Sequence, residues 1–235
     1  MPAEKTGSRC RVLIQNTLPE LIFHKRSERS ASLTPLLDFL FAASRLNVYN
    51  GGVNFERVLE ALLGEFDCRH IRYAAIGGFA LGVLGYPRTT IDLDFLMHKD
   101  DLNKVHDLLT NLGYQRVVHT ENVSQYRHDD DAWGSIDLIH AFRKTSLAML
   151  ARVKSYPVFG EKRTVKAVDP EDVIGLKVQA MVNDPDRRPQ ELADIERLMD
   201  LYGSKLDWKR IQEYYDVFGL GEEAKQLRKR FRRVH

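Results

Sequence analysis

The sequence has few cysteines, no excess of one charge and no long apolar run, and each shortage excludes a class of protein. Only Cys10 and Cys68 are present among 235 residues, which is too few for a disulfide framework and lacks metal-ligand spacing. Charged or polar residues interrupt every hydrophobic stretch, so no segment has the length of a transmembrane helix. No secretory signal pattern is present, and we therefore expect a cytoplasmic protein with no membrane partner.

The net charge is close to zero, because 35 Lys and Arg residues are balanced by 33 Asp and Glu residues for a formal charge of +2. Bulk charge therefore provides no non-specific attraction to nucleic acid. The composition, with 43% hydrophobic and 29% charged residues, is typical of a globular protein with one large domain or two small ones.

Turn residues and apolar spacing divide the chain into three parts. Residues 1–35 mix polar breakers with short apolar runs and are expected to form a mobile N-terminal arm. Residues 36–142 are expected to form one α/β domain, with helices from Pro35, after Asn54 and over 79–84 and 99–112, and strands over 72–76, 90–97, 114–120, 124–128 and 135–142. Residues 143–235 are expected to form a mainly helical C-terminal domain, with short extended pieces around Gly160.

One stretch carries most of the chemical information. Gly77 and Gly78 lie between an expected strand and an expected helix, where the backbone can approach a phosphate closely. The next strand carries Asp92 and Asp94, and alternate strand residues share a face, so both carboxylates point the same way. Adjacent like charges are costly unless a cation lies between them, and carboxylate oxygens suit Mg²⁺ that is bound together with substrate phosphates.

A third acid, Asp137, lies within an expected strand between apolar neighbours, where packing alone would not favour an acid. If this strand lies beside that of Asp92 and Asp94, three carboxylates converge. This arrangement is typical of two-metal phosphoryl or nucleotidyl transfer. The structural alternatives are that Asp92 and Asp94 are surface acids of a half-exposed strand and that Asp137 is only an acid at a strand end.

The two glycines, the segment Arg88-x-Thr90-x-Asp92-x-Asp94 and the later strand acid together resemble the nucleotidyltransferase superfamily, which has the fold of DNA polymerase β and kanamycin nucleotidyltransferase. A closer resemblance is to the AbiEii-like nucleotidyltransferase toxins and their uncharacterised bacterial relatives, whose C-terminal Lys and Arg-rich–Asp segments look like residues 176–180 and 187–194. The resemblance spans roughly residues 70–200. It implies a nucleotidyltransferase-type mixed α/β sheet flanked by helices and followed by a mainly helical domain.

The pattern and the resemblance together predict a Mg²⁺-dependent enzyme that moves an NMP from an NTP to an acceptor hydroxyl or phosphate. Two metal ions are expected, and the toxin relatives add tRNA or protein as acceptors and an antitoxin as a partner. Antibiotic-type relatives act on small molecules, and a non-catalytic nucleotide-binding regulator also stays open. The predicted catalytic and metal-binding residues are Asp92, Asp94 and Asp137, and the predicted nucleotide-binding residues are Gly77, Gly78, Arg88, Thr90 and Lys177.

Several of these assignments have a structural alternative. Arg88 could be a surface turn residue, and Lys177 could pair with Asp194 in the next helix. The basic segment from Glu222 to His235 could contact a nucleic-acid backbone, or its cations could complement the end of a solvated helix.

Overall fold

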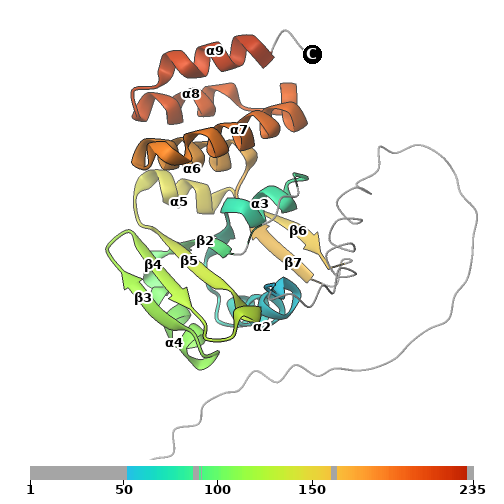
Figure 1. Ribbon diagram of the computed structural model, residues 1–235, viewed down its shortest axis with the longest axis vertical. Coiled ribbons are helices and arrows are strands. Elements are labelled where there is room, and N and C mark those ends of the chain that lie inside the picture. Colours follow the sequence, from blue (N-terminus) through green and yellow to red (C-terminus); the bar gives the residue numbers. More distant parts are fainter. Residues whose placement is uncertain (1–51, 87–89, 91, 160–162, 232–235) are drawn as a thin grey trace, which may run out of the picture. The chain divides into compact units, whose positions relative to one another are not determined.

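The computed structural model describes residues 52–86, 90, 92–159 and 163–231. Within them, a seven-stranded sheet is covered by helices on both faces, and a stack of helices follows it along the chain (Figure 1). The expected N-terminal arm, the helix expected from Pro35 and the residue Arg88 lie outside the described residues.

The sheet is mixed, which confirms the predicted fold class. The β2–β5 and β1–β7 pairs are parallel, and the other neighbours are antiparallel. The strand order across the sheet is β3 (Gln115–His119), β4 (Val123–Arg127), β5 (Ser135–Ala141), β2 (Asp92–His98), β1 (Tyr73–Ala75), β7 (Arg163–Ala167) and β6 (Lys154–Val158).

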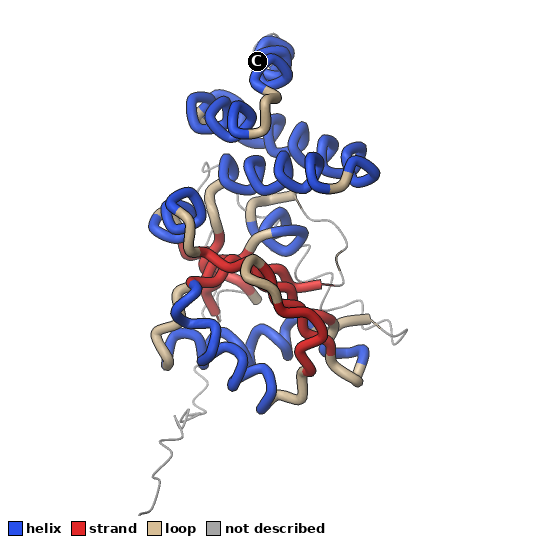
Figure 2. Tube along the Cα trace, turned by 90° about the vertical axis from the view of Figure 1, so that its left-hand side faces the viewer, coloured by secondary structure: helices blue, strands red, loops and turns tan. Residues whose placement is uncertain are grey.

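Helices α2 and α4 lie on one side of the sheet, and α3 and α5 lie on the other (Figure 2). Beyond α3 and α5, the C-terminal helices follow one another as a stack (Figure 1). The helices are α2 (Phe55–Cys68), α3 (Gly77–Val83), α4 (Leu102–Asn111), α5 (Lys144–Ala151), α6 (Pro170–Asn183), α7 (Arg188–Tyr202), α8 (Trp208–Val217) and α9 (Gly221–Phe231). Short 3₁₀ turns are η1 (Lys99–Asp101), η2 (Asp131–Trp133), η3 (Pro185–Arg187) and η4 (Gly203–Lys205).

Local sequence explains how α2 begins and which side it buries. The Asn54 side chain accepts a hydrogen bond from the Arg57 N–H, which satisfies one of the free donors of the first turn. The predicted apolar face is buried against the sheet, where Phe66 packs edge-on to Phe95. Its buried side chains are Val58, Leu59, Leu62, Leu63 and Phe66.

The sheet continues beyond residue 142, where the sequence analysis placed the end of the α/β domain. Strands β6 and β7 form a hairpin, and β7 pairs in parallel with β1 through Ala75 and Ala167. The uninterrupted helical part of the described chain therefore starts at Pro170. Among the described residues, no helix combines the length and apolar character that a membrane crossing requires.

Candidate active site

The register of the sheet brings the three predicted acids to one face. Along β2, Leu93 and Phe95 are buried, whereas Asp92 and Asp94 on the alternate face are partly exposed. The parallel pairing of β2 with β5 places Asp94 directly opposite Asp137. Directly paired residues of neighbouring strands share a face, so all three carboxylates point the same way.

Two of these carboxylates already have polar partners from the same sheet. The Ser135 hydroxyl donates a hydrogen bond to Asp92 Oδ1. Asp137 accepts from Gln125 Nε2 at 2.9 Å and from the Arg127 guanidinium at 3.0 Å. Within the described residues, no hydrogen bond or ion pair reaches the Asp94 carboxylate.

The surroundings of Asp94 disfavour its ionised form. Burial raises the pKa of Asp94 to about 6, and the negative charges of Asp137 and Asp92 add to this effect. The positive charges of Arg187 and Lys177 act in the opposite direction on the pKa of Asp94 but do not offset it. A cation on this face would relieve the repulsion.

The two glycines lie beside Asp94. Gly77 begins α3 with a φ of +61°, and a Cβ added at this position would collide with the Asp94 carboxylate. The Ile76 N–H donates to the Asp94 carbonyl oxygen at 3.0 Å, which fixes the turn against β2. Gly78 is buried in the first turn of α3. Only a residue without a side chain lets the chain pass this close to the acid.

The other predicted nucleotide-binding residues have structural partners where the structure describes them. The Thr90 hydroxyl donates to the Asp92 carbonyl oxygen at 3.1 Å and so supports the start of β2. The Lys177 side chain is only 7% exposed, and its ammonium lies 2.6 Å from carboxylate oxygens of both Glu191 and Asp194. The pairing of Lys177 with Asp194, which the sequence analysis left open, is therefore present.

Four polar residues near the predicted site were not predicted as site residues: Gln125, Arg127, Arg187 and Glu191. Gln125 and Arg127 alternate on β4 and so reach the same face as Asp137. Glu191 pairs with both Lys177 and Arg187. One of its carboxylate oxygens contacts the Lys177 ammonium, and the other lies 2.5 Å from the guanidinium of Arg187, at the end of η3. Period-two spacing in 124–128 could have indicated the first pair, but only the pairing of β4 with β5 places it beside Asp137.

The acids fit a divalent cation that arrives together with a nucleotide. Within the described residues, no group of three or more His, Cys, Asp or Glu side chains is arranged to hold an ion alone. Asp92 and Asp94 nevertheless offer carboxylate oxygens on one face, beside the backbone of Gly77. One or two carboxylates completed by substrate phosphates is the usual donor set for Mg²⁺.

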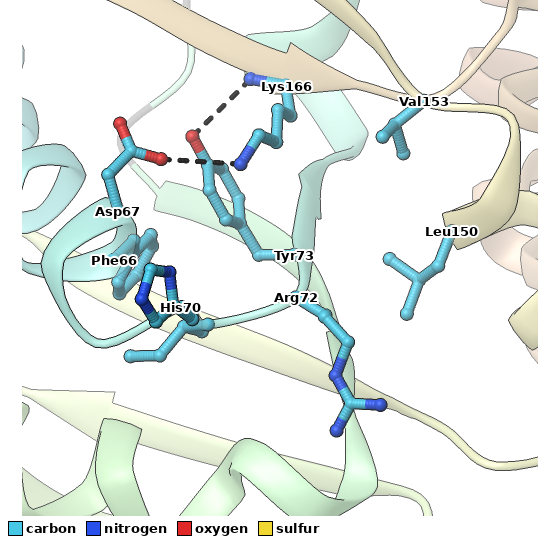
Figure 3. Close-up of a pocket in the computed structure, with 9 residues that line it drawn as sticks. Phe66, Asp67, His70, Arg72, Tyr73, Leu150, Val153 and Lys166 are labelled. Atoms are coloured by element: carbon cyan, nitrogen blue, oxygen red, sulfur yellow. Dashed lines mark hydrogen bonds and ion pairs between the residues drawn. The ribbon is translucent and has the colours of Figure 1, made fainter.

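A separate cavity of 340 Å³ lies at the other end of β1, close to α2 and β7 (Figure 3). Tyr73 lines it and pairs with Met97, at the opposite end of β2 from Asp92. Lys166 contacts two other residues of the cavity wall. Its ammonium lies 3.3 Å from a carboxylate oxygen of Asp67, and its backbone N–H donates a hydrogen bond to the Tyr73 hydroxyl at 3.4 Å. None of the predicted site residues lines this cavity.

One cation of the basic C-terminal helix α9 is paired with another helix, since Arg230 pairs with Glu196 of α7. Glu223, an acid of α9, accepts two hydrogen bonds from Arg188 of α7 at 2.6 and 2.7 Å and so does not offset the cations of its own helix. Arg228 and Lys229 of α9 are exposed. The contact with nucleic acid that the sequence suggested stays a prediction.

Three solved structures are similar to the chain, and the first of them shows the same fold. ANT(2")-Ia in complex with adenylyl-2"-tobramycin is 15% identical, with 76% of this chain and 97% of that chain covered and a TM-score of 0.50. The lincosamide antibiotic adenylyltransferase LnuA, lincomycin-bound, is 17% identical over 64% and 99% of the two chains, with a TM-score of 0.47. A nucleotidyltransferase-like protein from Paracoccidioides brasiliensis is 18% identical over 75% and 94%, also with a TM-score of 0.47. At 15% identity the likeness to ANT(2")-Ia concerns the fold alone.

No curated protein sequence matches the chain. A family model does: the one described as an uncharacterised nucleotidyltransferase matches residues 10–231. The predicted superfamily is thereby confirmed, and the chain belongs to this family of nucleotidyltransferases, enzymes that transfer phosphorus-containing groups.

Proposed function

We propose that the protein transfers an NMP from an NTP to an acceptor hydroxyl or phosphate in a reaction that depends on a divalent cation such as Mg²⁺. The acceptor oxygen forms a bond to the α-phosphorus, the bond from the α-phosphorus to the bridging oxygen breaks, and pyrophosphate leaves. The observation that carries this proposal is the register of Asp94 and Asp137, which joins three carboxylates on one face beside Gly77.

Asp92 and Asp94 hold the cation of the incoming nucleotide. When bound, this cation offsets the negative charge of the triphosphate and of the leaving pyrophosphate. The raised pKa of Asp94, which follows from burial and from the two neighbouring acids, supports this role because a cation would relieve that repulsion.

The nucleotide lies against Gly77 and Gly78, with Arg88 and Thr90 on the segment that leads into β2. Many members of the superfamily have Ser after the two glycines, whereas this chain has Phe79, so backbone N–H groups provide the phosphate contact there. Lys177 contributes through its charge, which opposes the rise in the pKa of Asp94, while Glu191 and Asp194 hold its ammonium.

Asp137 lies on the acceptor side of the acid face. Its carboxylate accepts a hydrogen bond from the acceptor hydroxyl and orients it for attack on the α-phosphorus. The acceptor classes that the sequence resemblance implies are tRNA, a protein or a small hydroxylated molecule. The first two correspond to a toxin-like enzyme with an antitoxin partner.

A transfer assay tests this proposal. The protein is incubated with Mg²⁺ and each of the four NTPs, labelled in the α- or the γ-phosphate, and with total tRNA, cell protein or a panel of small hydroxylated molecules. We expect label to reach one acceptor class from the α-phosphate only. Asp94→Asn should lower the rate by more than about 100-fold. Asp107→Asn, an exposed acid on α4, serves as the control and should retain the wild-type rate.

Transfer from the γ-phosphate would indicate a kinase and contradict the proposal. Nucleotide binding without transfer to any acceptor class would favour the non-catalytic regulator.

A further inference from the structure

Asp137 differs from the other two acids because both of its oxygens are engaged by side chains of β4. The Arg127 guanidinium donates to Oδ1 at 3.0 Å, and the Gln125 amide donates to Oδ2 at 2.9 Å. Gln125 is the direct cross-strand neighbour of Asp137, and Arg127 lies two residues further along the same face. The backbone register itself therefore builds this arrangement.

The Arg127 guanidinium is a fixed positive charge at the acid face. It also donates to the Tyr126 carbonyl oxygen at 3.1 Å, which anchors the group at the end of β4. Arginine stays protonated at any physiological pH, so this charge is permanent. The side chain is 45% exposed, and an ion pair this accessible adds little to folding stability. A substitution of Arg127 is therefore expected to leave folding stability nearly unchanged.

A second metal ion at this site would require the space beside Asp137 that the Arg127 guanidinium occupies. Two metal ions in such sites lie about 3.5–4 Å apart and share the carboxylates between them. A second ion on Asp137 would have to displace the guanidinium or lie against it, and like charges repel strongly at that range. Asp92 and Asp94 have no cationic side chain among their hydrogen-bond and ion-pair partners within the described residues.

We propose that the site takes one divalent cation, with its nucleotide, on Asp92 and Asp94, and that the Arg127 guanidinium takes the place of a second cation beside Asp137. This inference rests on the proposed function. It revises the sequence-based expectation of two ions. Arg127 acts through Asp137 and is a positioning residue, because it holds that carboxylate oriented and paired without a metal.

The experiment counts bound ions rather than turnover. The full chain is mixed with Mn²⁺ and one equivalent of each α,β-methylene nucleoside triphosphate in turn, and free and protein-bound Mn²⁺ are measured by electron paramagnetic resonance after ultrafiltration. The variants are Arg127→Gln, Asp137→Asn and the double variant. Arg69→Gln is the matched control, because Arg69 pairs with a single carboxylate, Glu65 at 2.8 Å, at the far end of α2.

We expect one Mn²⁺ per bound nucleotide in the wild type and in Arg69→Gln. Arg127→Gln leaves Asp137 without its cation and should bind a second, weaker Mn²⁺. Adding Asp137→Asn should bring the count back to one. Two ions in the wild type, or one ion in both the wild type and Arg127→Gln, would overturn the assignment.

Failure of the proposed function itself gives a different result. If the protein binds no nucleotide, no analogue binds to the wild type, and Mn²⁺ retention does not depend on nucleotide. If it binds nucleotide without transferring it, the ion counts above still apply and only the transfer assay is negative.

Discussion

Replacing Asp94 by Asn should stabilise the protein when metal and nucleotide are absent. Burial, the charge of Asp137 and the charge of Asp92 raise the pKa of Asp94 from 3.8 to about 6. At about 1.4 kcal/mol for each pKa unit, the ionised carboxylate costs the folded protein about 3 kcal/mol. Asn has nearly the same shape without the charge. The free energy of unfolding of the Asp94→Asn variant at neutral pH should therefore be higher than that of the wild type by up to about 3 kcal/mol.

The effect should depend on pH in a defined direction. An unfolded Asp ionises near pH 4, whereas the folded Asp94 ionises near pH 6. Between these values the folded wild type holds more protons than the unfolded chain, so its stability falls as the pH rises. The gain from Asp94→Asn should therefore be complete above pH 6 and should vanish below about pH 4.

Urea denaturation at a series of pH values with EDTA present measures this difference. The accompanying rise in Tm should be about 2–4 °C per kcal/mol for a chain of this size. Asp107→Asn, an exposed acid on α4, should change stability by less than about 0.5 kcal/mol. A destabilised Asp94→Asn variant at neutral pH, or a stabilisation that does not vary with pH, would refute the reasoning.

Three further substitutions test other parts of the structure. Gly77→Ala should lower the Tm and abolish the rise that NTP and Mg²⁺ induce, since φ is +61° and the new Cβ collides with Asp94; thermal melts with and without NTP measure both. Lys177→Met should lower the free energy of unfolding by roughly 3–5 kcal/mol in urea denaturation, because the buried carboxylates of Glu191 and Asp194 lose the ammonium that they share and Glu191 retains Arg187 alone; a loss below about 1 kcal/mol would contradict the buried ion cluster. Replacing Arg228 and Lys229 of α9 by Gln should leave the NTP-induced rise in Tm unchanged and flatten the salt dependence of RNA binding; an unchanged salt slope would identify α9 as a solvated helix.

Local sequence patterns were sufficient to predict most of the helices and strands. The alternation of Asp92 and Asp94 with Leu93 and Phe95 predicted a strand with one buried and one partly exposed face, which the structure has. Asn54 and the apolar spacing after it predicted the start and the buried face of α2. These features depend on residues a few positions apart, so the chain itself sets their geometry.

Local patterns did not predict the place of strands β6 and β7 in the sheet. Residues 156–158 and 164–168 were predicted to be extended, which agrees with β6 and β7, but the place of these strands in the sheet was not predicted. Strand β7 joins the sheet beside β1, which is separated from it by most of the domain. Because backbone hydrogen bonds can connect any two strands, the local pattern of β7 alone does not show which strand it pairs with.

The candidate site likewise has features that the sequence determined and features that only the tertiary structure decided. By itself, the sequence determined the acids, the two glycines and the family they resemble, because residue type and short spacing carry that information. Only the tertiary structure decided that Asp94 lies opposite Asp137, that Arg127 pairs with Asp137, and that Lys177 is held between Glu191 and Asp194. Each of these contacts joins separate strands or helices, and their energies depend on distance, burial and neighbouring charge, which exist only once the chain has folded.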